Sequence, residues 1–181
     1  CAVMFTDVRG FTAMAEALPP DSVVRILNEH LNSLTEIAHR HQGTVFNMTG
    51  DGLLIGFGVP IAVPEPCRLA VDAARAMQRG FGAFANSVQR RHQLVIGLGI
   101  GISYGPVIMG NVGSERFAAF TIIGDTVNIA ARIQEQTAPG GIMVTQRVRE
   151  AVPDVGESCA PARVALKGKV QDELVFSLAV A

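Results

Sequence analysis

Thr44-Val-Phe-Asn-Met48-Thr-Gly-Asp51-Gly-Leu53-Leu-Ile-Gly-Phe57 is the stretch of sequence that decides the fold. Two short apolar runs flank the turn residues Thr49-Gly-Asp-Gly52, which is the pattern of a β-hairpin. Apolar residues at helical spacing precede this hairpin from Pro20 to His41 and follow it from Cys67 to about Arg91. The hairpin therefore lies between two long helices.

One more apolar strand precedes the first of these helices, and another follows the second. Residues 2–8 are rich in Val, Met and Phe, and residues 94–103 form an unusually Gly-rich run. The resulting order β-α-β-β-α-β is the split βαβ pattern. It predicts an α+β fold in which an antiparallel sheet has these helices on one face.

The rest of the chain is predicted to form additional α/β elements. Residues 106–112 are expected to pair with the strand at 94–103, and a strand at 117–123 leads into a helix at 125–136. Pro139-Gly-Gly interrupts the chain before a short strand at 142–145. A small helix and an antiparallel pair, about 161–166 with 173–180, complete the prediction.

Composition indicates one globular domain over residues 1–181 and excludes several functions. The chain is 49% hydrophobic and 17% charged, with a net charge of −1, so nothing in its charge favours nucleic-acid binding. It has no Trp and one Tyr, which removes most base-stacking platforms. We find no apolar run of transmembrane length and no signal peptide. Cys1, Cys67 and Cys159 have unrelated spacings and are expected to be reduced thiols of a cytoplasmic domain.

The first residue already lies inside an apparent strand. We therefore expect the domain to be part of a longer protein, with an upstream regulatory domain and, in the whole protein, a possible membrane tether.

Two acidic residues are the first candidates for chemistry. Asp7 ends the first strand, and Asp51 lies in the hairpin turn. The predicted topology places that strand beside the hairpin, which brings both carboxylates to one end of the sheet. Paired carboxylates can hold two Mg²⁺ or Mn²⁺ ions whose remaining ligands are substrate phosphates.

A helix face and a turn supply candidates for binding a nucleotide. Asn128 and Arg132 are four residues apart, so they share one face of the helix at 125–136. An arginine offers a planar fork to phosphate, and an asparagine can orient a sugar. The turn Arg9-Gly10-Phe11-Thr12 comes shortly after Asp7 and opens a short helix, whose backbone N–H groups can bind an anion. Together these residues predict metal-assisted phosphoryl chemistry on a nucleotide.

Several motifs in order resemble the catalytic domain of class III nucleotidyl cyclases. They are Phe5-Thr-Asp7-Val-Arg-Gly10-Phe-Thr12, Gly50-Asp51-Gly52, Gly99-Ile-Gly-Ile-Ser-Tyr-Gly105, Ile123-Gly-Asp-Thr-Val-Asn128-Ile-Ala-Ala-Arg132 and Leu166-Lys167-Gly168. The resemblance covers almost the whole chain. It implies a ferredoxin-like core similar to polymerase palms, and conversion of a nucleoside triphosphate to its 3′,5′-cyclic monophosphate and pyrophosphate.

The resemblance also implies a role for each matching residue. Asp7 and Asp51 would bind the two metal ions, and Lys167 would bind the triphosphate. The family works as a head-to-tail dimer, in which Asn128 and Arg132 of one chain would reach the ribose and the α-phosphate bound to the other.

Base selection is where the sequence departs from the family pattern. Cyclases that use ATP usually have Lys at the position of Asn47, and guanylyl cyclases have Glu there. The second base-reading position is Thr121, as in the subgroup that includes bicarbonate-stimulated cyclases, whereas guanylyl cyclases have Cys. An Asn amide can donate to adenine or accept from guanine. We favour ATP because the remaining pattern matches adenylyl enzymes.

Other readings stay open at this point. The domain can be a homodimeric adenylate cyclase, a cyclase with relaxed or GTP specificity, or a weak or silent cyclase-like domain that binds nucleotide and regulates a neighbour. Silent domains usually lose a metal Asp, the Asn or the Arg, and this chain keeps all four. A palm of the polymerase or diguanylate-cyclase type would carry a different turn from Thr49-Gly-Asp-Gly52.

Overall fold

The computed structural model describes all residues of the chain except 115, 157–159, 165–171 and 181. The first half contains β1 (Ala2–Arg9), α1 (Phe11–Ala17), α2 (Pro20–Arg40), β2 (Gly43–Thr49), β3 (Gly52–Phe57) and α3 (Pro66–His92). The second half contains β4 (Gly97–Tyr104), β5 (Ile108–Ser114), β6 (Phe117–Ile123), α4 (Asp125–Gln136), β7 (Ile142–Thr145), α5 (Gln146–Ala151), β8 (Ala162–Val164) and β9 (Glu173–Ser177).

A seven-stranded sheet in the order β2-β3-β1-β4-β7-β9-β8 organises the domain. Strands β2, β3, β1 and β4 pair antiparallel, with α2 and α3 as their connections, which confirms the βαββαβ core predicted from the sequence. The sheet is not antiparallel throughout, because β7 pairs parallel to β4. Beyond β7, strands β9 and β8 add the predicted closing antiparallel pair.

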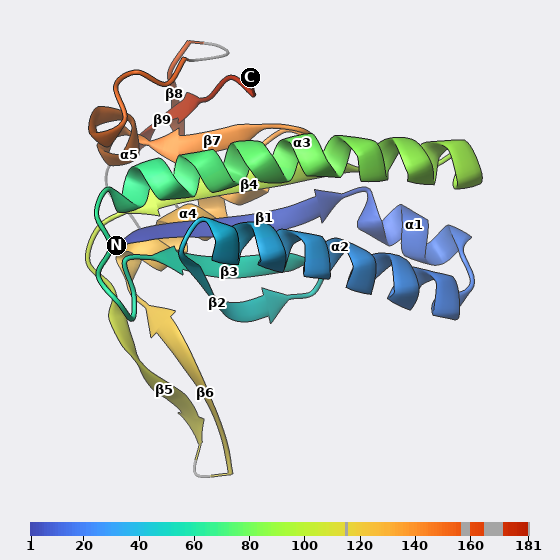
Figure 1. Cartoon of the computed structure of the whole chain (residues 1–181), viewed down its shortest axis with the longest axis horizontal. Coiled ribbons are helices and arrows are strands. Elements are labelled where there is room, and N and C mark those ends of the chain that lie inside the picture. The colour runs from blue at the N-terminus through green and yellow to red at the C-terminus, as the bar shows by residue number, and fades with distance from the viewer. Residues whose placement is uncertain (115, 157–159, 165–171, 181) are drawn as a thin grey trace.

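The two long helices cover one face of the sheet and bury the main core, as expected (Figure 1). Their inward side chains pack on alternate residues of the central strands, which include Met4, Leu53, Leu98, Ile100 and Ile102. The amide of Gln78 on α3 donates to the carbonyls of Leu98 and Gly141, both at 2.9 Å. These two hydrogen bonds fasten the helix across the β4–β7 side of the sheet.

Helix α4 covers the opposite face, which the sequence reasoning did not foresee (Figure 1). The glycines of the Gly-rich strand β4 explain how it fits. A Cβ added at Gly101 would lie 2.5 Å from the backbone carbonyl of Ala130 and 2.5 Å from the backbone nitrogen of Gln134. The alternation in Gly97-Leu-Gly-Ile-Gly-Ile102 therefore gives β4 a flat face for α4 and an apolar face for the main core.

Strands β5 and β6 form a separate two-stranded arm that projects from the body of the molecule (Figure 1). Residues 106–112 were expected to pair with β4, and this prediction was wrong. Strand β5 instead pairs antiparallel with β6, from Ile108 opposite Ile123 to Ser114 opposite Phe117. Pro106 and the turn after Tyr104 direct the chain away from the sheet, so pairing with the next strand in sequence replaces pairing with the previous one.

Cys1 and Cys67 are free thiols, as expected, and Cys159 lies outside the described residues. None of the helices in the described part of the chain combines the length and the apolar character that crossing a bilayer requires.

Candidate active site

The structure brings Asp7 and Asp51 together at one end of the sheet. Asp7 lies near the end of β1, and Asp51 lies in the turn between β2 and β3. The antiparallel register, with Phe5 opposite Leu54, places these two positions side by side. The backbone N–H of Val8 donates to Asp51 Oδ2 at 3.2 Å, so the turn is fastened directly to β1.

Gly52 explains why the turn can approach β1 so closely. A Cβ at this position would lie 1.8 Å from the carbonyl oxygen of Thr6, which no side chain tolerates. The neighbouring N–H of Leu53 donates to Thr6 Oγ1 at 3.0 Å. A glycine directly after Asp51 is therefore needed to hold the carboxylate against the first strand.

The two carboxylates repel one another. Partial burial and the nearby Asp7 carboxylate raise the pKa of Asp51 to about 6, against the opposing effect of hydrogen bonds from backbone N–H groups. A divalent cation between the two residues would remove this repulsion, and carboxylate oxygen is the ligand type that Mg²⁺ and Mn²⁺ prefer. The donor set therefore fits the metal site expected from the sequence.

Within the described residues no third His, Cys, Asp or Glu joins them in a cluster. Any ion held here would take its remaining ligands from backbone oxygens, water or a substrate phosphate.

Arg9 is a site residue that the sequence reasoning missed. Its Nη1 donates to Asp7 Oδ2 at 2.9 Å, its Nη2 donates to the carbonyl of Gln134, and its Nε donates to the carbonyl of Thr137 at 3.4 Å. The signal was present, because residues two apart on a strand point to the same face. Arg9 was considered only as part of the turn before α1.

The turn at Gly10 has the geometry expected of a strand-to-helix connection. Gly10 has φ of +84°, and α1 begins at Phe11. A Cβ at Gly10 would lie 2.7 Å from the carbonyl oxygen of Val95, so glycine is required on two counts. Gly10, Phe11 and Thr12 thus follow Asp7 at the start of a helix, although a phosphate role for them stays a prediction.

Asn128 and Arg132 both lie on α4, as expected from the sequence. Asn128 is exposed and Arg132 is half-buried. The hollow at Asp7 measures about 240 Å³, and its α4 lining consists of Ala131, Gln134 and Glu135. Among the described residues that line this hollow, neither Asn128 nor Arg132 is present. Asp51 is not among the described lining residues either, so this hollow contains one of the two carboxylates and no part of the Asn/Arg face.

The two candidate base-reading residues come from the sheet edge and the arm. Asn47 is exposed on β2, just after a register shift in its pairing with β3, and Thr121 is half-buried on β6. Their chain neighbours Phe46 and Phe120 have ring centroids 6.3 Å apart, which is within the range of aromatic pairs. The fold thus brings the two positions into one neighbourhood. Lys167 lies outside the described residues.

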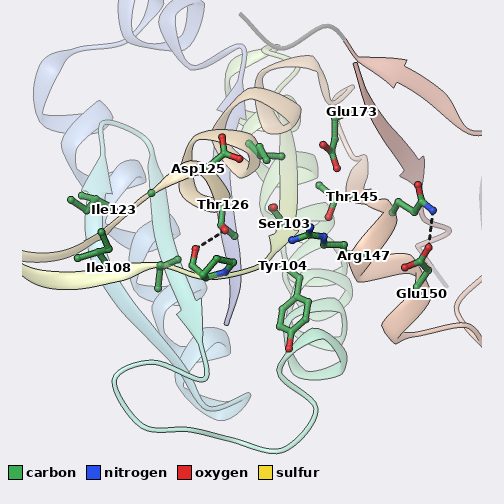
Figure 2. Close-up of a pocket in the computed structure, with 15 residues that line it drawn as sticks. Ser103, Tyr104, Ile108, Ile123, Asp125, Thr126, Thr145, Arg147, Glu150 and Glu173 are labelled. Carbon is green, nitrogen blue, oxygen red and sulfur yellow. Dashed lines mark hydrogen bonds between the residues drawn. The ribbon is translucent and has the colours of Figure 1, made fainter. Parts of the chain in front are cut away.

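A larger cavity of about 710 Å³ lies elsewhere, between the base of the arm, the start of α4 and α5 (Figure 2). Tyr104, Ile108 and Ile123 form its apolar part, and Asp125, Arg147, Glu150 and Glu173 give it a mixed charge. Thr126 Oγ1 donates to the carbonyl of Pro106 at 2.7 Å and fixes the start of α4 to the base of the arm. None of the candidate site residues within the described chain lines this cavity.

Comparison with known proteins places the chain in a family. A family model described as "Adenylate and Guanylate cyclase catalytic domain" matches residues 1–178. The chain therefore belongs to the class III nucleotidyl cyclase catalytic domains. It is 32% identical over 142 residues to adenylate cyclase 1 of Rhizobium meliloti, covering 78% of this chain and 21% of that protein. It is 29% identical over 168 residues to an adenylate cyclase of Mycobacterium tuberculosis, covering 93% of this chain and 37% of that protein.

Solved structures agree on the fold. The adenylyl cyclase CyaB from P. aeruginosa superposes with a TM-score of 0.92 at 26% identity, covering 98% of this chain and 92% of that one. The guanylyl cyclase Cya2 superposes with a TM-score of 0.90 at 30% identity, covering 98% of this chain and 90% of that one. The chain spans about a quarter of the length of the first curated relatives, which carry further sequence outside the matched region.

Proposed function

We propose that this domain is an adenylate cyclase that converts ATP to 3′,5′-cyclic AMP and pyrophosphate. The observation that carries the proposal is the pair of carboxylates, Asp7 and Asp51, held together beside β1 in a domain of the cyclase family. Membership of the cyclase family supports this type of reaction. The intact Asn128 and Arg132 on α4 favour an active enzyme over a silent nucleotide-binding domain.

In this reaction the 3′ oxygen of the ribose bonds to the α-phosphorus and loses its proton, while the bond to the β-phosphate oxygen breaks. Asp7 and Asp51 would hold two Mg²⁺ or Mn²⁺ ions, which would make the hydroxyl more acidic and neutralise the leaving pyrophosphate. Asn128 orients the ribose, and Arg132 stabilises the negative charge that develops on the α-phosphate. The backbone at Gly10, Phe11 and Thr12, together with Lys167, binds the remaining phosphates.

The active site is shared between two copies of the chain. The hollow at Asp7 is lined by residues of its own α4 other than Asn128 and Arg132, which supports a site that takes this face from a second protomer. A head-to-tail arrangement with a two-fold axis supplies it twice and creates two equivalent sites.

The arm offers a surface for the second copy. Five apolar side chains of β5 and β6 are exposed, namely Ile108, Met109, Val112, Phe120 and Ile123. Exposed apolar groups concentrated on one projecting element are typical of a protein–protein interface. A two-stranded ribbon is also marginal by itself and gains stability when it packs against a partner.

ATP is the substrate we favour, with GTP as the alternative. The named relatives at 29–32% identity are adenylate cyclases, whereas the similar solved structures include both adenylyl and guanylyl cyclases. Asn47 supports either base, because its amide presents both a donor and an acceptor. We place the reaction in the cytoplasm and expect an upstream regulatory domain; the greater length of the relatives supports further domains without placing them.

One assay tests the proposal. The purified domain is incubated with ATP or GTP in the presence of Mg²⁺ or Mn²⁺, and both cyclic nucleotides are quantified. We expect cyclic AMP as the main product. An excess of cyclic GMP over cyclic AMP reverses the base assignment, and no product with either substrate supports the silent alternative.

A mixing experiment tests the shared site. Asp7→Ala and Arg132→Ala are each inactive alone, but one of the two sites in their heterodimer is complete. We expect the mixture to regain activity. If heterodimers form and stay inactive, the whole site belongs to one chain.

A further inference from the structure

Arg9 connects two parts of the protein that serve different active sites. One guanidinium contacts the Asp7 carboxylate and, on its other edge, the backbone carbonyls of Gln134 and Thr137 at the end of α4. Its side chain is only 25% exposed, so these contacts are not those of a solvated surface ion pair. A planar guanidinium can donate in several directions at once, which a lysine cannot do.

The contact places a positive charge at the C-terminal end of α4. Its last turn has no basic residue, and Glu135 adds negative charge there. A positive group stabilises the carbonyl groups at a helix C-terminus, and Arg9 of β1 supplies it. Gly99 leaves space for the guanidinium, since a Cβ there would lie 3.2 Å from Arg9 Nε.

We propose that Arg9 is a positioning residue that transmits metal occupancy at Asp7 to α4 of the same protomer. The inference rests on the proposed function, in which that α4 presents Asn128 and Arg132 to the partner's metal site. The two active sites of the dimer are then coupled through Arg9. The Asp7 carboxylate and α4 do not need to contact each other for this coupling.

The physical basis is competition for one guanidinium. A cation at Asp7 draws the carboxylate charge toward itself and weakens the ion pair with Arg9. The guanidinium then binds the helix carbonyls more strongly, and the end of α4 becomes more ordered. By reciprocity, fixing α4 in the partner's complete site changes the affinity of Asp7 for metal by the same factor.

Hydrogen–deuterium exchange of the complete chain with Mn²⁺ alone tests the link without any turnover. We expect the amides of residues 134–138 to exchange several-fold more slowly with Mn²⁺ in the wild type, and the effect to disappear in Arg9→Gln. Arg9→Lys keeps the positive charge but lacks the planar guanidinium, so it should show little of the slower exchange that Mn²⁺ causes. Arg40→Gln removes an exposed arginine paired with Glu36 on α2 and serves as the matched control, with the wild-type response.

No Mn²⁺ effect in the wild type, or the same effect in the Arg9 variants, overturns the proposal. Arg9→Lys guards against a loss of fold in Arg9→Gln, and circular dichroism of each variant confirms that it is folded.

Mixed dimers separate the two contacts of Arg9. When Asp7→Ala and Arg132→Ala are combined, the complete site takes its metal carboxylates from the Arg132→Ala protomer and its α4 from the other. Adding Arg9→Gln to the Arg132→Ala protomer should lower the Mn²⁺ concentration for half-maximal activity, because the Asp7 carboxylate is then no longer paired with a guanidinium. Adding it to the Asp7→Ala protomer should lower kcat about tenfold at an unchanged Mn²⁺ requirement.

If Arg9→Gln in the Asp7→Ala protomer leaves kcat unchanged, Arg9 does not position α4. Failure of the starting mixture to show activity would refute the shared site instead, and the exchange experiment would still report on the link inside one chain.

Discussion

At the scale of single residues, Asp51 has a carboxylate that the metal-free fold disfavours. Its pKa is raised to about 6, above the usual value of 3.8, because it is partly buried near Asp7. An acid whose folded pKa is raised destabilises the folded state above that pKa, and stability is regained as pH falls through about 6 toward 4. The residue is thus retained at some cost to the fold, which is typical of a functional site.

Asp51→Asn should therefore separate activity from stability. The amide oxygen can still accept from Val8, and the repulsion with Asp7 is gone. We expect activity to fall by at least about 10³-fold, as for loss of a principal charge-stabilising group. The thermal midpoint of the metal-free protein should stay the same or rise at pH 7. Asp154→Asn, which breaks an exposed pair with Arg68, is the control and should keep full activity.

Asn47→Lys tests the base-reading position. A neutral amide makes a weaker hydrogen bond than an ammonium by about 1 kcal/mol, which corresponds to about five- to tenfold in discrimination. We expect the ratio of kcat/KM for ATP over GTP to rise by that factor. The exposed position of Asn47 on β2 should tolerate Lys without loss of stability. An unchanged ratio would show that this residue does not contact the base.

His30 makes the stability of the domain sensitive to acid. It is buried on α2, stacked on Phe84 at 5.5 Å and edge-on to Phe81 at 5.1 Å, and its Nε2 has no hydrogen-bond partner among the described residues. Burial lowers the pKa of His30 to about 4. A base whose folded pKa is lowered supports full stability above its ordinary value of 6.5, and stability is lost as pH falls from 6.5 toward 4.

The loss attributable to His30 at pH 4 should be about 3 kcal/mol. Denaturant unfolding from pH 7 to 4 should show a correspondingly shallower decline for His30→Leu than for the wild type. His39→Gln, at an exposed position on the same helix, should decline like the wild type. Parallel curves for His30→Leu and wild type would contradict a buried neutral imidazole.

At the scale of elements, the contact between β4 and α4 determines where Asn128 and Arg132 lie. The atoms nearest to a Cβ on Gly101 belong to the backbone of α4, which cannot rotate away as a side chain can. Gly101→Ala should therefore move the helix and destabilise the domain by about 1–3 kcal/mol. Activity should fall more than tenfold, because small displacements of catalytic groups are costly.

Gly82→Ala is the matched control for Gly101→Ala. Gly82 lies on α3 with nothing within 4 Å of its added Cβ. In a helix this change should stabilise the fold by about 0.5–1 kcal/mol and leave activity unchanged. A Gly101→Ala variant as stable and active as Gly82→Ala would show that α4 has room to adjust.

At the scale of the whole molecule, the arm should control assembly. Val112 is 44% exposed on β5, and a charge there would be placed against the apolar surface of a partner. Val112→Glu should raise the dimer dissociation constant at least tenfold, as measured by analytical ultracentrifugation. Specific activity should fall at low protein concentration and recover at high concentration.

Val24→Glu provides the control for Val112→Glu. Val24 is 57% exposed on α2, away from the arm, and should affect neither assembly nor activity. Activity independent of concentration in both variants would argue against a shared site.

The sequence by itself determined the core order of strands and helices. Periodicity and turn residues suffice to predict the elements from β1 through α3, since each of them carries its own local pattern. The same patterns indicated that Asp7 and Asp51 meet, because a strand beside a hairpin leaves few other arrangements. The motif residues Asp7, Asp51, Asn128 and Arg132 can likewise be recognised from the sequence alone.

Only the tertiary structure decided how the parts outside this core are placed. Local patterns do not tell whether β5 pairs with β4 or β6, or which face of the sheet α4 covers, since these choices depend on contacts between elements. The contacts of Arg9 with Gln134 and Thr137 join positions more than 120 residues apart in the chain. These contacts arise because β1 pairs beside β4 while α4 packs over the glycines of β4, and no local sequence pattern encodes that arrangement.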